Sequence, residues 1–341
     1  MVTPTLGHIS GVNQNLRISP TALNQHLLIT GKSGSGKTVS LKIIEEGIAL
    51  QGGHVLVLNF NGTHDALSGQ DQVKFINART DGIPLPLFSP IIRPDGREEE
   101  IDDICEAVTD VFSNVGRLGS SQRRILSETC YKAIENLTCY SDDMKCLYAS
   151  LAVCEEEAGL ALIDKFWILL KKAKFMKDGK LWESGLITVL DFSEFNASSQ
   201  RLLAEMVMSI LLRQHRICGQ QTEKPVWIVC DEFQALNLRE GSVLAQILRE
   251  GRKFKLSLLL ATQTLSTFDT GCRALLLQAG TKLYFRPSEI DIRKVAKDMP
   301  GIQREKAQQM LHKLAVGECL AEGEFLVGTH SVEKVFKMSF L

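Results

Sequence analysis

The sequence predicts an α/β fold in which helices flank a mainly parallel β-sheet. Short apolar runs alternate along the chain with stretches of helical periodicity, the pattern of strands joined by crossover helices. Most of these runs are continuous rather than alternating, as expected for strands buried on both faces. One run, Leu27–Thr30, leads into the glycine-rich segment Gly31–Thr38, and a helix-forming stretch from Val39 to Leu50 follows. A strand, a glycine-rich turn and a helix in this order are typical of such a sheet.

Six apolar runs are candidates for strands of this sheet, and the C-terminal tail differs from them. The predicted strands are Leu27–Thr30, His54–Phe60, Leu186–Phe192, Val226–Cys230, Leu256–Thr262 and Lys282–Phe285. In the tail, short segments separated by turn residues predict a small antiparallel C-terminal β element made of Glu318–Ala321, Glu324–Val327 and Val332–Lys337.

The chain changes character after Pro84, where a proline-rich stretch gives way to long helical periodicity. Apolar residues recur there at helical spacing: Ile101, Ile104, Val108, Val111 and Phe112. We therefore expect residues 97–185 to form an all-helical insertion between two strands. Residues 1–96 and 186–341 are expected to form the domain that contains the sheet.

A complete phosphate loop of the form G-x-x-x-x-G-K-[ST] follows the first strand; it is Gly31-Lys32-Ser33-Gly34-Ser35-Gly36-Lys37-Thr38. Its glycines let backbone amides close around a phosphate, and the helix that follows points its positive end at the anion. The lysine is placed to reach the β- and γ-phosphates, and the threonine hydroxyl to bind Mg²⁺. A merely structural turn would require neither Lys37 nor Thr38, so the motif predicts binding of a nucleoside triphosphate.

The strand Val226–Cys230 ends in an acidic pair, Asp231 and Glu232. In a phosphate-loop site, the first carboxylate supports Mg²⁺ and the second polarises the water that attacks the γ-phosphate. The alternative is an apolar strand that simply ends at solvent, but the upstream phosphate loop favours the catalytic interpretation. The expected region contains no N-K-x-D motif for reading guanine. ATP is therefore the expected substrate, with Mg²⁺ as its cofactor.

Polar residues flank the strand Leu256–Thr262 at both of its ends. Gln263 follows the strand. An amide at this position, next to the acidic strand, can sense the γ-phosphate or the attacking water. The alternative is that Gln263 is only a turn residue at the end of the strand. Arg249 and Arg252 precede the strand near the end of a predicted helix. Cations are favoured at that end of any helix, so the residues alone leave a catalytic role for the two arginines open.

Several segments resemble the HerA/FtsK superfamily of ATPases, which includes the HerA DNA translocases, the FtsK chromosome pumps and the ATPases of type IV secretion. The most specific similarity lies in Leu248–Phe254 together with the strand end Ala261–Gln263. A late strand of the family that carries an arginine is similar to Gly280–Arg286, and its closing "GE" turn is similar to Ala315–Cys319. The resemblance extends over nearly the whole chain.

This resemblance implies a RecA-like P-loop NTPase fold and a homohexameric ring that hydrolyses ATP between subunits and drives a polymer through its channel. It assigns ATP binding to Gly31–Thr38 and the metal to Thr38 and Asp231. It assigns activation of water to Glu232 and the sensor role to Gln263. It also implies an arginine finger that reaches the γ-phosphate of a neighbouring subunit, for which the candidates are Arg252, Arg249 and Arg286.

The chain departs from the family pattern at four places. Relatives often carry an aspartate at the end of the second strand, where this chain has Asn59, and His64 or Asp65 could replace the missing carboxylate. Relatives commonly have glycine at the position of Lys255. The 26 residues before Leu27 are too few for the β-barrel domain of HerA, and we expect no winged helix of the FtsK type. These departures predict a nearly minimal motor.

Composition restricts the expected cellular location of the protein and the way in which it could contact DNA. No apolar run approaches the ~20 residues of a membrane span, and nine scattered cysteines without a C-x-x-C pair are typical of reduced thiols. We therefore expect a cytoplasmic protein without membrane insertion. A net charge of −1 excludes a protein that coats DNA by bulk charge, but permits a ring whose few pore residues contact DNA.

Two further regions are candidates for contact with a polymer. Pore loops are expected within residues 62–82 and 264–274. A basic run near the end of the predicted insertion is interpreted first as a solvated face and second as a nucleic-acid contact; it comprises Lys171, Lys172, Lys174, Lys177 and Lys180.

Three functions compete on this sequence. The leading hypothesis is an ATP-driven ring that translocates DNA, as a helicase does, with a separately encoded nuclease or other effector, including in antiviral defence. The second is a secretion or conjugation motor at a membrane. The third is an ATP-gated scaffold that assembles a partner and moves nothing. Glu232 and Gln263 favour turnover over gating, because binding alone needs neither.

Overall fold

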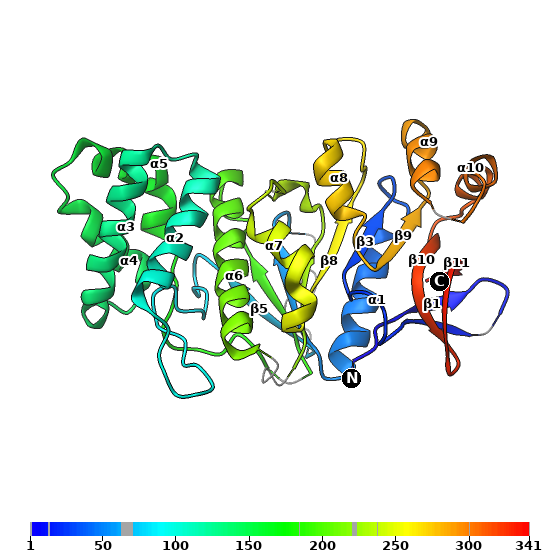
Figure 1. Cartoon of the computed structure of the whole chain (residues 1–341), viewed down its shortest axis with the longest axis horizontal. Helices are drawn as coiled ribbons and strands as arrows, with labels where there is room; N and C mark the ends of the chain where they lie inside the picture. The colour runs from blue at the N-terminus through cyan, green and yellow to red at the C-terminus, as the bar shows by residue number, and fades with distance from the viewer. Residues whose placement is uncertain are drawn as a thin grey trace.

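The computed structural model describes residues 2–12, 14–62, 71–183, 185–219, 224–236, 238–299 and 301–340. Its centre is an 11-stranded sheet (Figure 1). The parallel part of the sheet contains, in spatial order, β9 (Thr281–Phe285), β3 (Leu27–Thr30), β8 (Leu256–Thr262), β7 (Val226–Cys230), β4 (His54–Asn59), β6 (Ile187–Asp191) and β5 (Val73–Asn77). All six predicted strands are present, so the predicted mainly parallel α/β fold is confirmed. The edge strand β5 was missed, because it is only half-buried and lacks a continuous apolar run.

Beyond β9 the sheet turns antiparallel. This part contains β10 (Glu318–Val327), β2 (Asn15–Ile18), β1 (Thr5–Ile9) and β11 (His330–Ser339). The pairing β10–β11 closes these four strands into a ring of neighbours.

The antiparallel element differs from its prediction at Gly323. Two predicted segments are one continuous strand, β10, because Gly323 does not make a turn. A Cβ atom at this position would lie 2.7 Å from the carbonyl oxygen of Gly280, so glycine allows the neighbouring backbone to approach. The N-terminal strands β1 and β2 complete the element and were not predicted.

Helices cover both faces of the sheet, and other helices lie at each end of the molecule (Figure 1). The helices are α1 (Lys37–Leu50), α2 (Ile101–Gly116), α3 (Ser120–Glu135), α4 (Asp143–Ala152), α5 (Glu157–Lys172), α6 (Ala197–Cys218), α7 (Val243–Glu250), α8 (Thr270–Leu276), α9 (Glu289–Asp298) and α10 (Arg304–His312). Helices α2 to α5 form one end of the molecule, within the segment expected to be an insertion. The division into two domains stays a prediction. None of the helices in the described ranges is long and apolar enough to cross a membrane.

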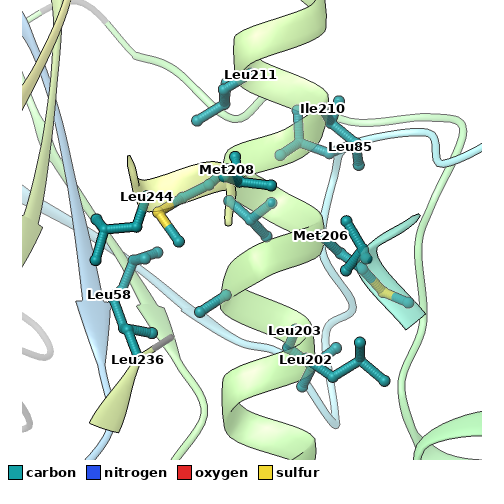
Figure 2. Packing of buried hydrophobic residues seen from close by; sticks show 14 of the residues in the cluster. Leu58, Leu85, Leu202, Leu203, Met206, Met208, Ile210, Leu211, Leu236 and Leu244 are labelled. Carbon is teal, nitrogen blue, oxygen red and sulfur yellow. The ribbon is translucent and has the colours of Figure 1, made fainter. Parts of the chain in front are cut away.

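Helix α6 joins the helical end of the molecule to the sheet. It is 22 residues long, and all residues from Leu202 to Met208 are buried, so this part of the helix is covered on every side. Met208 lies on the side of Leu244 of α7 and Leu58 of β4, whereas Met206 lies on the side of Leu85 (Figure 2). Helix α6 therefore packs into one hydrophobic core with both the helical end of the molecule and the sheet.

A buried ion pair fixes the start of the helical segment against α6. Arg213 Nε lies 2.8 Å from Glu99 Oε1, and Arg213 Nη2 donates to Glu99 Oε2 at 3.2 Å. Burial lowers the pKa of Arg213, and the Glu99 carboxylate opposes that effect. Because Glu99 also accepts the Ile91 amide at 3.3 Å, the proline-rich stretch is held at the same point.

Candidate functional site

The carboxyl ends of three neighbouring parallel strands gather most of the predicted site residues. β3 runs into Gly31–Thr38, β7 ends before Asp231 and Glu232, and β8 ends before Gln263. β8 lies between β3 and β7 in parallel register with both. Ligands of open α/β sheets bind at this edge, so the structure brings the loop, the acidic pair and the glutamine together.

The phosphate loop is packed between two segments from the end of the chain. Gly36 has φ of 110°, and a Cβ atom there would lie 3.0 Å from the amide nitrogen of Gly317. The Gly317 amide donates to the Ser35 carbonyl at 3.0 Å, and the Lys32 amide donates to the Arg286 carbonyl at 2.9 Å. The "GE" turn and the end of β9 therefore set the shape of the loop, which explains the need for glycine at position 36.

Lys37 lies in the hollow of the phosphate loop. Its ammonium group donates to the carbonyl oxygens of Gly31 at 2.8 Å and Lys32 at 3.1 Å. Burial lowers the pKa of Lys37, and the carboxylates of Glu232 and Asp231 oppose that effect. The ammonium group is thus held where a phosphate of a bound nucleotide would meet it.

Thr38 and Asp231 join the two halves of the site. The Thr38 hydroxyl donates to Asp231 Oδ2 at 2.8 Å. The other carboxylate oxygen, Oδ1, is buried and has no hydrogen-bond partner in the described part of the chain. Mg²⁺ prefers hydroxyl and carboxylate oxygens, and a cation would satisfy the unpaired oxygen. This donor set therefore fits Mg²⁺.

Glu232 lies two residues after the end of β7, in a sharply turned backbone with φ of 58° and ψ of 47°. This left-handed conformation costs a non-glycine residue roughly 1–3 kcal/mol, and such strain is often found at functional sites. Gln263 Nε2 donates to Glu232 Oε1 at 2.9 Å, and Gln234 Nε2 donates to Oε2. The carboxylate is therefore held between two amides.

Gln234 is a residue that sequence reasoning missed. Its Oε1 accepts a hydrogen bond from the Thr262 hydroxyl at 3.0 Å, while its amide group holds Glu232. The only signal in the sequence is an amide two residues after the acidic carboxylate. Its orientation depends on Thr262 of β8, far along the chain, so no local pattern predicts it.

Two of the three candidate arginines lie apart from these residues. Arg252 is exposed in the turn Gly251–Phe254 before β8, whereas Gln263 follows β8. The seven residues of β8 separate them by roughly 20 Å. Arg249 is half-exposed on α7 and pairs with Glu240 at 3.3 Å. Only Arg286 lies beside the phosphate loop of its own chain, through its carbonyl group.

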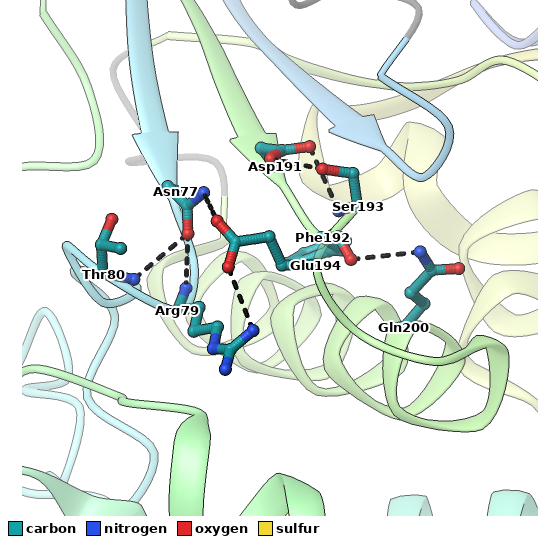
Figure 3. A network of polar contacts seen from close by, with 8 residues as sticks. All are labelled: Asn77, Arg79, Thr80, Asp191, Phe192, Ser193, Glu194 and Gln200. Atoms are coloured by element: carbon teal, nitrogen blue, oxygen red, sulfur yellow. Dashed lines mark hydrogen bonds and ion pairs between the residues drawn. The ribbon is translucent and has the colours of Figure 1, made fainter.

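Asn59 contacts a carboxylate of the neighbouring strand, β6. Its Nδ2 donates to Asp191 Oδ1 at 3.0 Å, and the two residues are register partners in β4 and β6. Asp191 is buried and also accepts the Ser193 hydroxyl at 2.8 Å (Figure 3). The predicted substitutes, His64 and Asp65, lie outside the described residues.

Polar contacts continue along the same edge beyond β6. Asn77, at the end of β5, donates to Glu194 Oε1 at 2.8 Å, and Arg79 donates to the other oxygen at 3.1 Å (Figure 3). Part of the expected pore loop within 62–82 is therefore bonded to the segment after β6. Residues 63–70 of that loop lie outside the described residues.

The basic run 171–180 is not a uniformly solvated face. Lys174 donates to the Thr80 carbonyl at 3.0 Å, and Lys177 donates to the Tyr140 carbonyl at 2.9 Å. The ammonium group of Lys171 lies 3.8 Å from the ring centroid of Tyr148, where the face of the ring attracts a cation. These lysines tie the segment after α5 to its surroundings.

Two family models match the chain. One, described as the central domain of the helicase HerA, matches residues 5–213. The chain belongs to this family. A second model, described as the DNA-binding domain of the type IV secretion-system coupling protein, matches residues 174–334. No curated protein matches the sequence. The resemblance to the HerA/FtsK superfamily is thereby confirmed.

Solved structures share the fold at low sequence identity. VirB4 of Thermoanaerobacter pseudethanolicus superposes with a TM-score of 0.72 and 17% identity, over 98% of this chain and 95% of that chain. The plasmid coupling protein TrwB in complex with GDPNP gives a TM-score of 0.66 and 18% identity, over 99% and 89%. TrwB in complex with ADP and Mg²⁺ gives 0.60 and 17%, over 93% and 85%. These structures confirm the RecA-like P-loop NTPase fold.

Proposed function

We propose that this HerA-family chain is an ATP-hydrolysing ring motor that translocates DNA. The observation that carries the proposal is Glu232, a carboxylate held between Gln263 and Gln234 at the edge that also presents Lys37. A site that only binds nucleotide needs no such carboxylate. TrwB, which shares this fold, has been solved in complex with ADP and Mg²⁺, and this supports the same ligands here.

The residues divide the chemistry of ATP hydrolysis among them. Lys37 and the loop amides bind the β- and γ-phosphates, and Thr38 and Asp231 would hold Mg²⁺. Bound Mg²⁺ supplies positive charge to the phosphate oxygens. Glu232 accepts a proton from the water whose oxygen attacks the γ-phosphorus, while the bond to the ADP oxygen breaks. Gln263 lies beside Glu232 and would orient the water or the γ-phosphate.

The distance of Arg252 from this edge supports a site shared between subunits. An arginine that stabilises charge on the γ-phosphate accelerates such reactions by roughly 10³–10⁵. Arg252 lies at the other end of β8 from Gln263, so it cannot reach the nucleotide of its own chain. We therefore propose that Arg252 acts on the neighbouring subunit of a homohexamer, ahead of Arg249 and Arg286.

DNA is the polymer that the comparisons favour. The matched models are described as a helicase domain and as a DNA-binding domain. A separately encoded nuclease or other effector, and a role in antiviral defence, belong to the proposal as its partner and setting. Co-purification of the chain with such an effector from its native host tests that part.

The conjugation or secretion motor is a second candidate. The similarity to VirB4 over 98% of this chain, and the coupling-protein model over residues 174–334, favour it. Such a motor would co-purify with membrane proteins and would move protein or a DNA–protein complex. Recovery of the chain in a detergent-solubilised complex, without stimulation by free duplex, would favour this candidate over the first.

The test of the proposed function is the effect of duplex DNA on ATP hydrolysis by the purified chain. We expect duplex DNA to raise the rate of phosphate release, with an effect that falls steeply as salt rises. Lys37→Ala is the control and should remove hydrolysis with or without DNA, because the charge opposite the phosphates is lost. Hydrolysis without any response to DNA, in the presence of assembled rings, would instead favour the scaffold or secretion hypotheses.

A further inference from the structure

A cavity of about 450 Å³ lies beside the candidate site, on the side of the helical segment. Its walls come from the end of α2, from α6, from the residues after the turn Phe233–Ala235 and from the segment before α8. The cavity therefore lies where the helical end of the molecule meets the edge of the sheet. None of its walls belongs to the phosphate loop.

Three arginines line this cavity: Arg117, Arg201 and Arg239. Arg201 is held in place by a hydrogen bond from its Nε to the Ala235 carbonyl at 2.8 Å. In the described part of the chain, its two terminal amino groups have no hydrogen-bond partner, and neither does the guanidinium of Arg117. A planar guanidinium group matches the geometry of a phosphate better than any other side chain does.

One carboxylate lines the same cavity, but it is already bonded. Asp269 Oδ1 accepts the Cys272 amide at 2.8 Å at the start of α8. Hydrogen bonds from that amide and from the Cys272 thiol lower the pKa of Asp269, and both tie the carboxylate to its own helix. Arg117 and Arg201 alone outnumber this carboxylate, so the cavity favours an anion.

Arg117 occupies a position that normally favours glycine. It ends α2 in the left-handed region, with φ of 52° and ψ of 55°, although Gly116 directly precedes it. A side chain at this position costs free energy that glycine would not. Strain of this kind is found where a side chain serves a function, and here the side chain adds charge to the cavity.

The cavity also touches the residue that holds the catalytic carboxylate. Gln234 lines it and donates to Glu232 Oε2. Phe268, another wall residue, stacks on Phe233 at 5.3 Å between ring centroids. An occupant of the cavity would therefore contact the two segments that position Glu232.

We propose that this cavity binds the phosphodiester backbone of the DNA that the motor moves, and that Gln234 transmits occupancy to Glu232. The proposal rests on the proposed function, because it presumes that DNA is the polymer. Arg117 and Arg201 contact phosphate oxygens. Gln234 is a positioning residue, since it acts on the reaction only through the carboxylate that it holds.

The experiment compares Arg117→Gly and Arg117→Lys with a control, Arg304→Gln, an exposed arginine at the start of α10. Binding of a fluorescently labelled duplex is measured by anisotropy in ATPγS over a series of salt concentrations. Arg117→Gly should weaken binding about fivefold to tenfold and make the log–log salt slope less steep by about 1. Arg117→Lys keeps the charge, so its affinity for duplex and its salt slope should lie between those of Arg117→Gly and those of the wild type.

The melting temperature of Arg117→Gly distinguishes a loss of DNA binding from a loss of stability. Because glycine relieves the left-handed strain, Arg117→Gly should melt at a temperature no lower than the wild type while it binds DNA more weakly. Wild-type affinity and salt slope in Arg117→Gly for both duplex and single-stranded DNA would overturn the inference and leave the proposed function intact. If the wild-type chain itself bound no duplex, the DNA part of the proposed function would fail, and this inference with it. If single-stranded DNA, and not duplex, lost affinity in the variant, the bound polymer would be the single strand.

Discussion

The two edges of the parallel sheet carry different chemistry. At the carboxyl edge, Lys37, Asp231 and Glu232 meet within one chain, from the ends of β3 and β7, which flank β8 in parallel register. At the amino edge, Arg252 is exposed on a short turn, and no phosphate-binding loop lies beside it in the described part of the chain. The groups proposed to bind nucleotide and activate water thus meet within one chain, whereas the arginine proposed as a finger is exposed at the opposite edge.

The amino edge is also built rigidly. A Cβ atom at Gly251 would lie 2.3 Å from the Leu256 carbonyl oxygen and 3.1 Å from His26 Cε1, so only glycine fits there. His26 Nδ1 accepts the Leu258 amide at 3.0 Å from beneath the turn. A turn fixed this closely to the start of β8 holds the backbone of Arg252 in one place, as a residue that acts on a neighbouring molecule requires.

The largest expected effect follows from removing the arginine of the amino edge. Arg252→Ala should lower the rate of ATP hydrolysis by roughly 10³–10⁵, because charge on the γ-phosphate would lose its partner. Its affinity for ATP, measured by titration with a fluorescent analogue, should stay close to that of the wild type, because the phosphate loop of each subunit is intact. Arg249→Ala, which removes the exposed neighbour on α7, is the matched control and should have a smaller effect.

Mixing subunits distinguishes a shared site from a site within one chain. Rings formed from Arg252→Ala and Glu232→Gln subunits should recover part of the activity, wherever an intact Glu232 faces an intact Arg252. The recovery should disappear below the concentration at which rings form. Full hydrolysis by a dilute monomer of the wild-type chain would contradict both the arginine finger and the shared site.

Glu232→Gln changes the carboxyl edge alone. We expect it to lower hydrolysis by roughly 10²–10⁴, the usual contribution of a general base, while ATP still binds. Analytical ultracentrifugation with ATP should show assembled rings, because the variant keeps the phosphate contacts of Lys37. A rate equal to that of the wild type would mean that another residue acts as the general base. Asp191, beside Asn59, would be the first candidate.

Gln234→Met removes an amide from the carboxyl edge and keeps the length of the side chain. We expect kcat to fall about tenfold with KM for ATP unchanged, because a positioning contact acts on the reaction and not on the binding of phosphate. Gln309→Met, at an exposed position on α10, is the control. A change in KM with kcat unchanged would show that Gln234 affects ATP binding instead.

The last prediction concerns the pH dependence of stability at the amino edge. Burial lowers the pKa of His26 from 6.5 to about 4. As pH falls from 6.5 towards 4, the unfolded chain gains a proton that the folded chain does not, so the free energy of unfolding should decrease. The total loss from this group is about 3 kcal/mol, complete near pH 4. Urea titrations at several pH values should show a shallower decline for His26→Gln, and an equal decline would contradict the assignment.

Much of the fold followed from local patterns in the sequence. The six strands of the parallel core were predictable because burial on both faces leaves continuous apolar runs, as in β7 and β8. β1 and β2 were not, because they are short and only partly apolar, and their pairing partners β10 and β11 lie at the far end of the chain. Likewise, Gly323 looked like a turn until Gly280 was placed against it.

The sequence by itself determined which chemical groups the candidate site contains. The phosphate loop, Asp231 with Glu232, and Gln263 each follow a strand at a fixed spacing, and a strand that ends in such residues places them at one edge of a parallel sheet. The roles of these residues stay predictions, but their meeting at one edge could be anticipated because it requires only the direction of the strands.

Only the tertiary structure decided how these groups contact one another. Asn59 meets Asp191 across 132 residues of sequence, and Gln234 meets Thr262 across 28. The order of the strands also placed Arg252 at the opposite edge from Gln263. Contacts across neighbouring strands depend on how distant segments pair in space, and hydrophobic burial, which drives that pairing, is not directional and leaves no local signal at the polar residues it brings together.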